Sequence, residues 1–363
     1  MIFSRSPLTI DVTPLLDDQW TGIPVFTQRL IVALRRNGQL DLRFGVNGVA
    51  IPNDDVDLAI RAGTGIYLRD AHARALAPRR PKAVDRRIPL LYPSVKHDAG
   101  LGGREASTVH DLSTLFMPEH HEDANVRHHL EHFTEELATD EVVFCASEAT
   151  RAALTTAFPS ARPKARVLYQ YAEWPEEFAL LERNLARLAL GRYAVVIGTI
   201  EPRKNLQLIL DAASTKEVQR SGVRFVVIGR RGWLMDRAFE ALSQQQRESI
   251  QFTGFVSEFT KYRLLKHAEF LVYPSIYEGF GIPAVEAMSL GKPVLAARTS
   301  SFPEIIGDAG VYFDPASVSE FAASFKEIQH ARKLSELAPK AIAQAERFGW
   351  ARMAQPVVKW LTG

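Results

Sequence analysis

The sequence predicts an α/β protein made of two doubly wound domains, each with a parallel sheet that helices cover on both faces. Its 363 residues suit two domains better than one, because a domain typically takes about 150 residues. In the second half, short β-branched runs alternate with segments that carry apolar residues at helical spacing, and the first half repeats this alternation less regularly. Such alternation is typical of parallel sheets, whose strands are joined by crossover helices.

In the first half, six runs rich in β-branched and aromatic residues predict strands, and two longer segments with helical periodicity predict helices. The expected strands are residues 8–12, 42–46, 88–92, 107–109, 141–144 and 166–169, and the expected helices are residues 22–36 and 125–138. The pattern breaks between Tyr171 and Gly191, where Ala172-Glu-Trp-Pro-Glu176 precedes a connecting helix. We therefore expect the first domain to span residues 1–185.

The second half predicts a further domain over residues 186–347. Its expected strands are residues 193–198, 223–229, 250–254, 270–273 and 293–297. Between the first two of these strands, Leu206, Ile209 and Leu210 recur at helical spacing. Two similar α/β domains would then bracket a cleft.

Composition excludes several classes of protein. With 46% hydrophobic and 24% charged residues, the chain is not disordered, collagenous or a coiled coil overall. Cys145 is the only cysteine, which excludes an internal disulfide and a thiolate-rich metal site. The first residues lack the apolar stretch of a secretory signal, and no run approaches the ~18 apolar residues of a membrane span. We expect a cytoplasmic protein, either soluble or peripheral at the inner face of the membrane.

Charge is distributed unevenly between the two halves. Up to residue 185, 21 Lys and Arg stand against 25 Asp and Glu, and beyond it 23 stand against 17. The second domain is therefore better suited to an anionic ligand, although solvated surface charge produces excesses of this size as well.

Two cations follow the first strand of the second domain. Ligands of open parallel sheets bind beyond the carboxyl ends of strands, where helix N-termini expose free amides. After the strand that ends at Gly198, Arg203 and Lys204 stand where the chain enters a helix. Two cations at a helix start suit a diphosphate, while exposed loop residues explain them equally well on spacing alone.

The densest signal is a glycine-rich segment between two glutamates. Gly279 and Gly281 let the backbone approach a ligand closely, so the amides of residues 280–282 would face that ligand at a helix start. Glu278 precedes the glycines and Glu286 lies about one turn into the helix. Two carboxylates so placed are able to accept hydrogen bonds from separate hydroxyls of one polyol.

This segment, Glu278-Gly-Phe-Gly-Ile-Pro-Ala-Val-Glu286, resembles the paired-glutamate motif of the retaining nucleotide-sugar glycosyltransferases of family 4. Four more segments match that family in order, at residues 198–205, 227–233, 252–256 and 302–310. Five ordered motifs are far more specific than a single glycine-rich match. The resemblance implies the GT-B architecture, in which two Rossmann-like domains face a cleft. It also implies that the last segment, residues 348–363, crosses back to the first domain.

The resemblance implies a role for each matched residue. Arg203 and Lys204 would hold the donor diphosphate and stabilise the leaving group. Glu278 would contact hydroxyls of the transferred sugar, and Glu286 would hold the ribose hydroxyls. The remaining donor-binding positions would be Gly22, Gly198, Thr199, Gly229, Arg230, Gly254, Phe255, Val256, Gly279, Phe280, Gly281 and Ile282. Many members have Arg where this chain has Thr199, so we expect Arg203 to take over that charge.

In the first half, Thr21-Gly-Ile-Pro24 resembles the family's N-terminal glycine loop and Val109-His-Asp-Leu112 resembles its histidine motif. Gly22 would let the backbone approach the phosphate and the acceptor. His110 would face the transferred sugar, with Asp111 in support. A lone histidine at a strand end is more often structural, so this role rests on the other motifs.

Two metal hypotheses are weaker. Asp55-Val-Asp57 suits a divalent ion on a donor diphosphate, but acids in a solvated turn explain it, and the resemblance implies that no metal is required. His128 and His132 share a helical face that suits zinc, with His120, His121 and His129 nearby. A polar helix explains this cluster equally well, and an acceptor-binding role for His129 and His132 is a third hypothesis.

A basic stretch precedes residue 88. It contains Arg74, Arg79, Arg80, Lys82, Arg86 and Arg87, with Asp85 as the one acid among them. It suits an anionic bilayer or a phosphorylated acceptor, and a solvated loop explains it as well. Nucleic acid is not an expected partner, because no aromatic-interleaved basic face or known motif accompanies the charge.

The sequence thus predicts a metal-independent, retaining hexosyltransferase whose first domain binds the acceptor and whose second binds the donor. The donor would be a nucleoside diphosphate sugar, GDP-mannose first, and it is a substrate, so no cofactor is expected. The acceptor would be a hydroxyl of a saccharide or a lipid-linked saccharide, and the catalytic residues would be His110, Arg203, Lys204 and Glu278. The alternatives are a nucleotide-sugar epimerase or sugar phosphorylase on the same scaffold, and a non-catalytic nucleotide-sugar binding protein.

Overall fold

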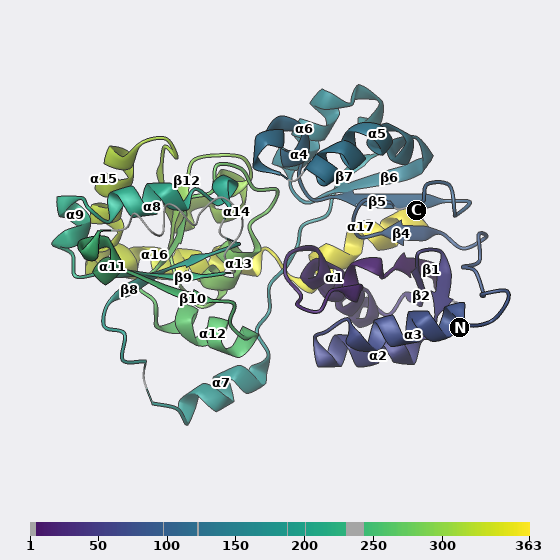
Figure 1. Cartoon of the computed structure of the whole chain (residues 1–363), viewed down its shortest axis with the longest axis horizontal. Helices are drawn as coiled ribbons and strands as arrows, with labels where there is room; N and C mark the ends of the chain where they lie inside the picture. The colour runs from purple at the N-terminus through teal and green to yellow at the C-terminus, as the bar shows by residue number, and fades with distance from the viewer. Residues whose placement is uncertain (1–4, 97, 122, 187, 200, 230–242) are drawn as a thin grey trace. The chain divides into compact units, whose positions relative to one another are not determined.

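The computed structural model describes residues 5–96, 98–121, 123–186, 188–199, 201–229 and 243–363 (Figure 1). Contacts divide the chain into two units, Met1–Tyr171 together with Trp350–Gly363, and Ala172–Gly349. Each unit is built on one sheet of mainly parallel strands. The predicted pair of α/β domains is confirmed.

The first unit holds, in its described part, a seven-stranded sheet in the order β3-β2-β1-β4-β5-β6-β7. Its strands are β1 (Ser6–Asp11), β2 (Leu40–Val46), β3 (Val49–Ile51), β4 (Leu90–Tyr92), β5 (Glu105–Val109), β6 (Asp140–Cys145) and β7 (Ala165–Val167). All neighbours are parallel except β2 and β3. The sequence did not predict β3, which pairs antiparallel with β2 at the edge of the sheet.

The helices of the first unit include both that the sequence predicted. They are η1 (Thr13–Leu16), α1 (Ile23–Asn37), α2 (Asn53–Ala62), α3 (Ile66–Leu76), α4 (Ser113–Phe116), η2 (Pro118–His120), α5 (Asp123–Thr139), α6 (Glu148–Ala157), η3 (Pro159–Ala161) and α17 (Trp350–Thr362). The last of them, yellow in Figure 1, packs beside α1. Met353 and Val357 of α17 are fully buried in the core of this unit.

A buried ionic cluster ties the amino ends of β5 and β6. The Lys96 side chain is fully buried, and its Nζ lies 2.8 Å from Oε2 of Glu105 and 2.7 Å from Oδ1 of Asp140. Burial raises the pKa of the Asp140 carboxyl to about 6, against the attraction of Lys96. Glu105 and Asp140 are the first residues of β5 and β6, whereas His110 follows the opposite end of β5. The cluster therefore lies away from the predicted site, and we assign it a structural role.

The second unit holds, among the residues described, a six-stranded parallel sheet in the order β10-β9-β8-β11-β12-β13. Its strands are β8 (Tyr193–Ile197), β9 (Arg224–Ile228), β10 (Ile250–Gly254), β11 (Leu271–Tyr273), β12 (Val294–Ala297) and β13 (Gly310–Phe313). Strands β11 and β12 are buried along their whole length, as expected for strands covered on both faces. The sequence did not predict β13, which begins at a glycine.

Helices cover both faces of this second sheet (Figure 1). They are α7 (Glu176–Arg183), η4 (Pro202–Lys204), α8 (Leu206–Ala212), α9 (Lys216–Gln219), α11 (Gln244–Ser249), α12 (Glu258–His267), α13 (Ile282–Ser289), α14 (Phe302–Ile306), η5 (Gly307–Ala309), α15 (Val318–Ile328) and α16 (Ala331–Glu346). Helices α8, α9 and α15 pack together, and α13 packs with α16.

The division between the units differs from the expected boundaries after residues 185 and 347. It falls between Tyr171 and Ala172 and again between Gly349 and Trp350. The connecting segment belongs to the second unit because its side chains pack there. The Trp174 indole lies 5.4 Å from the Tyr262 ring of α12, and Glu182 pairs with Arg263 of that helix at 2.5 Å. The contacts of Trp174 and Glu182 with α12 therefore place this linker-like segment in the second unit.

Candidate active site

Three glycines bring the carboxyl ends of β8, β9 and β10 together. The amide of Gly198 donates to the carbonyl of Ile228 at 3.0 Å, and the amide of Gly229 donates to the carbonyl of Gly254 at 3.1 Å. A Cβ atom on Gly229 would lie 1.9 Å from the carbonyl oxygen of Gly198. A side chain is therefore excluded at Gly229, where the end of β9 meets the end of β8. The next predicted residue, Arg230, lies outside the described residues.

The loop after β8 is tied to the loop after β11. Asn205 has a left-handed backbone (φ 53°), and its side-chain amide donates to the carbonyls of Pro274 at 3.2 Å and Pro315 at 2.9 Å. The amide of Ile276 donates to the carbonyl of Arg203 at 3.0 Å. Asn205 was not predicted from the sequence, although it follows Lys204 directly. These bonds fix the backbone that carries the two predicted cations.

Arg203 and Lys204 meet at the carboxylate of Glu278. Lys204 Nζ lies 2.5 Å from Oε1 of Glu278, and Nη1 of Arg203 lies 3.5 Å from Oε2. The side chains of Lys204, Arg203 and Glu278 are 19%, 12% and 10% exposed. Burial alone would raise the pKa of the Glu278 carboxyl, but the charges of Lys204 and Arg203 and the hydrogen bond from Lys204 lower it. The structure thus brings three of the predicted residues into one charged cluster.

Other groups hold this cluster in place. Arg203 also bonds to Oε1 of Glu201 at 2.8 Å and to the carbonyl of Tyr277 at 2.9 Å. The methylene stem of Lys204 passes Gly198, where a Cβ would lie 3.4 Å from it. Burial, followed by the charge of Glu278, raises the pKa of the Tyr273 hydroxyl. Thr199, by contrast, is exposed.

The glycine-rich segment starts α13 in a constrained conformation. Gly281 has φ 98°, and a Cβ there would lie 3.2 Å from the Phe302 ring and 3.3 Å from the Tyr273 ring. The hydroxyl of Ser301 donates to the carbonyls of Glu278 at 2.9 Å and of Phe280 at 3.1 Å. Gly279, Phe280 and Gly281 are buried, and Ile282 begins α13. Ser301 was not predicted as a site residue, although it belongs to a run of hydroxyl residues that follows β12.

Glu286 lies on α13 with 2% of its surface exposed. Its carboxylate contacts Lys261 of α12, at 3.1 Å between Nζ and Oε2. Lys261 was not predicted, since nothing in the local pattern of α12 relates it to the distant glutamate. The loop before α12 carries Phe255, 48% exposed, and Val256, which is half-buried.

Two predicted residues belong to the first unit. Gly22 is the N-cap of α1 and has φ 51°, with nothing within 4 Å of an added Cβ. The ring of His110 bonds through Nε2 to the carbonyl of Pro93 at 2.7 Å and meets the Phe26 ring edge-on at 4.6 Å. Burial lowers the pKa of His110, so its imidazole is neutral at pH 7. Asp111 accepts from the amide of Ser113 at 2.8 Å, which fixes the turn into α4.

The residues of the two metal hypotheses have other partners. Asp55 pairs with Arg74 at 2.8 Å, and Asp57 pairs with Arg35. The side chains of His128 and His129 lie outside the described residues, and His132 Nε2 lies 4.0 Å from Glu131. Among the described residues, no group of three His, Cys, Asp or Glu side chains is placed to hold a metal ion.

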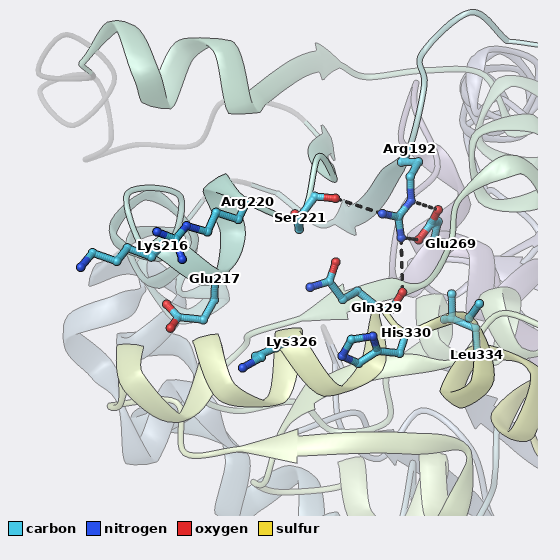
Figure 2. A pocket seen from close by; sticks show the side chains of 11 residues that line it. Arg192, Lys216, Glu217, Arg220, Ser221, Glu269, Lys326, Gln329, His330 and Leu334 are labelled. Carbon is cyan, nitrogen blue, oxygen red and sulfur yellow. Dashed lines mark hydrogen bonds and ion pairs between the residues drawn. The ribbon is translucent and has the colours of Figure 1, made fainter.

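A hollow of about 700 Å³ lies at the opposite end of the second sheet (Figure 2). Arg192, which precedes β8, bonds there to the carboxylate of Glu269 at 2.7 and 2.8 Å and to the carbonyl of Ser221 at 2.9 Å. The side chains of Lys216, Arg220 and Lys326 line the same hollow without converging on one point. None of the predicted site residues that the structure describes lines this hollow.

The described helices include none that is both long and apolar enough to cross a membrane.

The chain matches the family model described as glycosyl transferases group 1 over residues 187–347. O-antigen chain mannosyltransferase B of Escherichia coli is 32% identical over 255 residues, which cover 68% of this chain and 67% of that protein. The serotype-specific mannosyltransferase WbdA of the same species is 27% identical over 210 residues, 54% of this chain but only 26% of WbdA.

Solved structures share the fold over nearly the whole chain. Sucrose-phosphate synthase from Thermosynechococcus elongatus has a TM-score of 0.69 at 17% identity, covering 98% of both chains. WaaG, a glycosyltransferase involved in lipopolysaccharide biosynthesis, has a TM-score of 0.65 at 14% identity, covering 98% of this chain and 100% of WaaG. HepE of Anabaena, solved in complex with UDP-glucose, has a TM-score of 0.67 at 17% identity, with 98% and 99% covered.

Proposed function

The chain belongs to the glycosyl transferases of group 1 and has the GT-B fold, and from this premise we propose that it transfers mannose from a nucleoside diphosphate sugar to a saccharide hydroxyl. GDP-mannose is the proposed donor, and a saccharide or lipid-linked saccharide is the proposed acceptor. The similarity to O-antigen mannosyltransferases supports the choice of mannose. HepE, which was solved in complex with UDP-glucose, supports a nucleotide-sugar donor in this fold.

The observation that carries the proposal is the charged cluster of Arg203, Lys204 and Glu278. Two cations stand on a rigid loop at the carboxyl end of β8, 2.5 and 3.5 Å from one buried carboxylate. Cations fixed in this way would stabilise charge on a departing diphosphate without a reorganisation step. In the proposed reaction they do so without a metal ion.

The proposed chemistry retains the anomeric configuration. The bond between C1 of the sugar and the diphosphate oxygen breaks early, and positive charge develops on the sugar ring. The acceptor oxygen bonds to C1 from the face that the diphosphate leaves, and the hydroxyl proton passes to a phosphate oxygen. Glu278 and the amides of Phe280 and Gly281 hold the sugar hydroxyls in place. His110 is neutral at pH 7 and donates its Nε2–H to the carbonyl of Pro93, so its Nδ1 accepts a hydrogen bond from a sugar hydroxyl without adding charge.

A panel of donors tests this function. The purified chain is incubated with GDP-mannose, UDP-glucose and related nucleotide sugars, with and without an α-mannoside acceptor, and the products are analysed by NMR. We expect transfer of mannose with retained configuration, undiminished by EDTA. Interconversion of donors without an acceptor would indicate an epimerase, dependence on inorganic phosphate a phosphorylase, and binding without turnover a non-catalytic protein.

A matched pair of variants tests the role of the cluster. Lys204→Met removes a cation from Glu278, and we expect kcat/KM to fall about 100-fold or more, as for lost transition-state stabilisation. Lys216→Met removes an exposed cation of α9 in the same unit, and it should leave kcat/KM unchanged. Equal effects of the two changes would contradict the assignment.

We propose that the first unit binds the acceptor and makes peripheral contact with an anionic membrane on the cytoplasmic side. Arg79, Arg80, Lys82 and Arg86 are all exposed, and such clusters are attracted to anionic lipid. Co-sedimentation with vesicles containing phosphatidylglycerol, but not with neutral vesicles, is the expected result. Replacing the four residues by Gln should abolish it.

A further inference from the structure

Lys261 fixes the carboxylate of Glu286 through both of its oxygens. The Lys261 Nζ lies 3.2 Å from Oε1 and 3.1 Å from Oε2 of Glu286. The Glu286 side chain is 2% exposed and that of Lys261 is 15% exposed. A buried carboxylate requires a partner, because losing it would leave an uncompensated charge. The lysine therefore fixes the orientation of the Glu286 carboxylate.

Trp174 holds this pair from the side of the connecting segment. Its indole Nε1 donates to the carbonyl of Glu286 at 3.2 Å and to the hydroxyl of Ser289 at 3.1 Å. The Lys261 Nζ also lies 5.4 Å from the centre of the Trp174 ring, within the range of a cation–π interaction. The ammonium is thus held by a carboxylate and by an aromatic face.

A second carboxylate, that of Glu258, reaches the same lysine at 2.9 Å, but its side chain is 55% exposed. An exposed partner contributes little, since water competes for both groups. The contact that matters for Lys261 is therefore the buried one to Glu286.

We infer that Lys261 is a positioning residue for the nucleotide ribose, acting through Glu286, and this inference rests on the proposed function. A carboxylate has about four lone-pair sites, more than one ammonium group occupies, and Lys261 contacts both oxygens of Glu286. Two such acceptors, held in one plane, match the neighbouring 2′ and 3′ hydroxyls of a ribose. In this role Lys261 acts through Glu286 and not by direct contact with the donor.

The test uses Lys261→Met, with Lys266→Met as its matched control. Lys266 stands on the same helix, but its Nζ bonds to the Tyr262 hydroxyl at 3.3 Å. Binding of GDP and UDP is measured by calorimetry for the full chain, each in its ribose and its 2′,3′-dideoxy form. We expect Lys261→Met to weaken binding of the ribose form about tenfold, as for one lost charged hydrogen bond, and to change the dideoxy form less than twofold. Lys266→Met should change neither.

Three further measurements separate positioning from structure. Lys261→Arg should restore ribose binding, because it keeps the charge. In turnover assays Lys261→Met should raise the donor KM and leave kcat unchanged. In the background of Glu286→Gln, Lys261→Met should have little additional effect, since the lysine acts through that carboxylate.

Two results would overturn the inference, and they are distinguishable. If the wild-type chain binds neither GDP nor UDP, the proposed function fails and the inference fails with it. If the wild-type chain binds but Lys261→Met weakens the ribose and dideoxy forms equally, the function stands and Lys261 has only a structural role.

Discussion

Glu278 remains charged although it is nearly closed off from water. Its carboxylate gives up hydration but gains Lys204 at 2.5 Å and Arg203 at 3.5 Å, and the pKa of the Glu278 carboxyl is lowered as a result. The cations in turn depend on it, because two positive charges on one short loop repel each other. Such mutual dependence makes the cluster sensitive to the loss of any one member.

Replacing Glu278 by Gln tests this dependence through pH. A carboxyl whose pKa is lower in the folded protein stabilises it above the ordinary pKa of about 4.3, and the contribution is lost as pH falls through the folded value. At pH 7 we expect Glu278→Gln to lower the free energy of unfolding by about 3 kcal/mol. The difference from the wild type should shrink as the pH falls below about 4.

Urea denaturation between pH 3 and pH 7 measures that difference. Glu217→Gln, an exposed residue of α9, serves as the control and should remain close to the wild type throughout. A deficit of Glu278→Gln that stays constant down to pH 3 would show that the carboxylate is not held by its charge.

At the scale of elements, the candidate site is one block of hydrogen-bonded loops. The loop after β8 is tied to the loop after β11 by Asn205, and the loop after β12 holds that second loop through Ser301. Gly229, at the end of β9, lets that strand end approach the end of β8 closely. The side chains of the site are therefore positioned by backbone that cannot move independently.

Gly229→Ala tests how closely the strand ends must meet. The added Cβ would lie 1.9 Å from the carbonyl oxygen of Gly198, so the backbones must separate and the loop that carries Lys204 must shift with them. We expect a loss of about 3 kcal/mol in the free energy of unfolding, together with weaker donor binding. Thermal denaturation and calorimetric titration with GDP measure the two effects.

Gly222→Ala is the control for backbone strain. Gly222 also has a positive φ, of 68°, but nothing lies within 4 Å of an added Cβ. Its replacement should cost only the strain of a left-handed residue, about 1–2 kcal/mol, and leave donor binding unchanged. Equal costs for both variants would mean that the contact between the strand ends is not constraining.

At the scale of the whole molecule, the sequence predicted the strands and the site residues that short local patterns encode. Alternating runs predicted most strands of both sheets, and ordered motifs led to the residues that gather around Glu278. It did not predict Lys261, because its partner Glu286 lies on another helix and only the fold brings the two side chains together. It also placed the first boundary too late, since a proline-containing segment looks like a linker until Trp174 is seen to contact α12 and α13.

The last helix provides the test at this scale, because α17 belongs to the first unit although it follows the second in the chain. Met353 and Val357 are fully buried in the first unit, and Arg104 donates to the carbonyl of Trp360 at 3.0 Å. A chain ending at Gly349 loses these side chains together, and deleting each large buried side chain costs about 2–5 kcal/mol. Since whole domains are stable by only about 5–15 kcal/mol, we expect the first unit to unfold while the second keeps its own transition in a calorimetric scan. A chain ending at Leu361, which lacks only two exposed residues, should behave as the full chain does. If the chain ending at Gly349 keeps both transitions, α17 is not part of the first core.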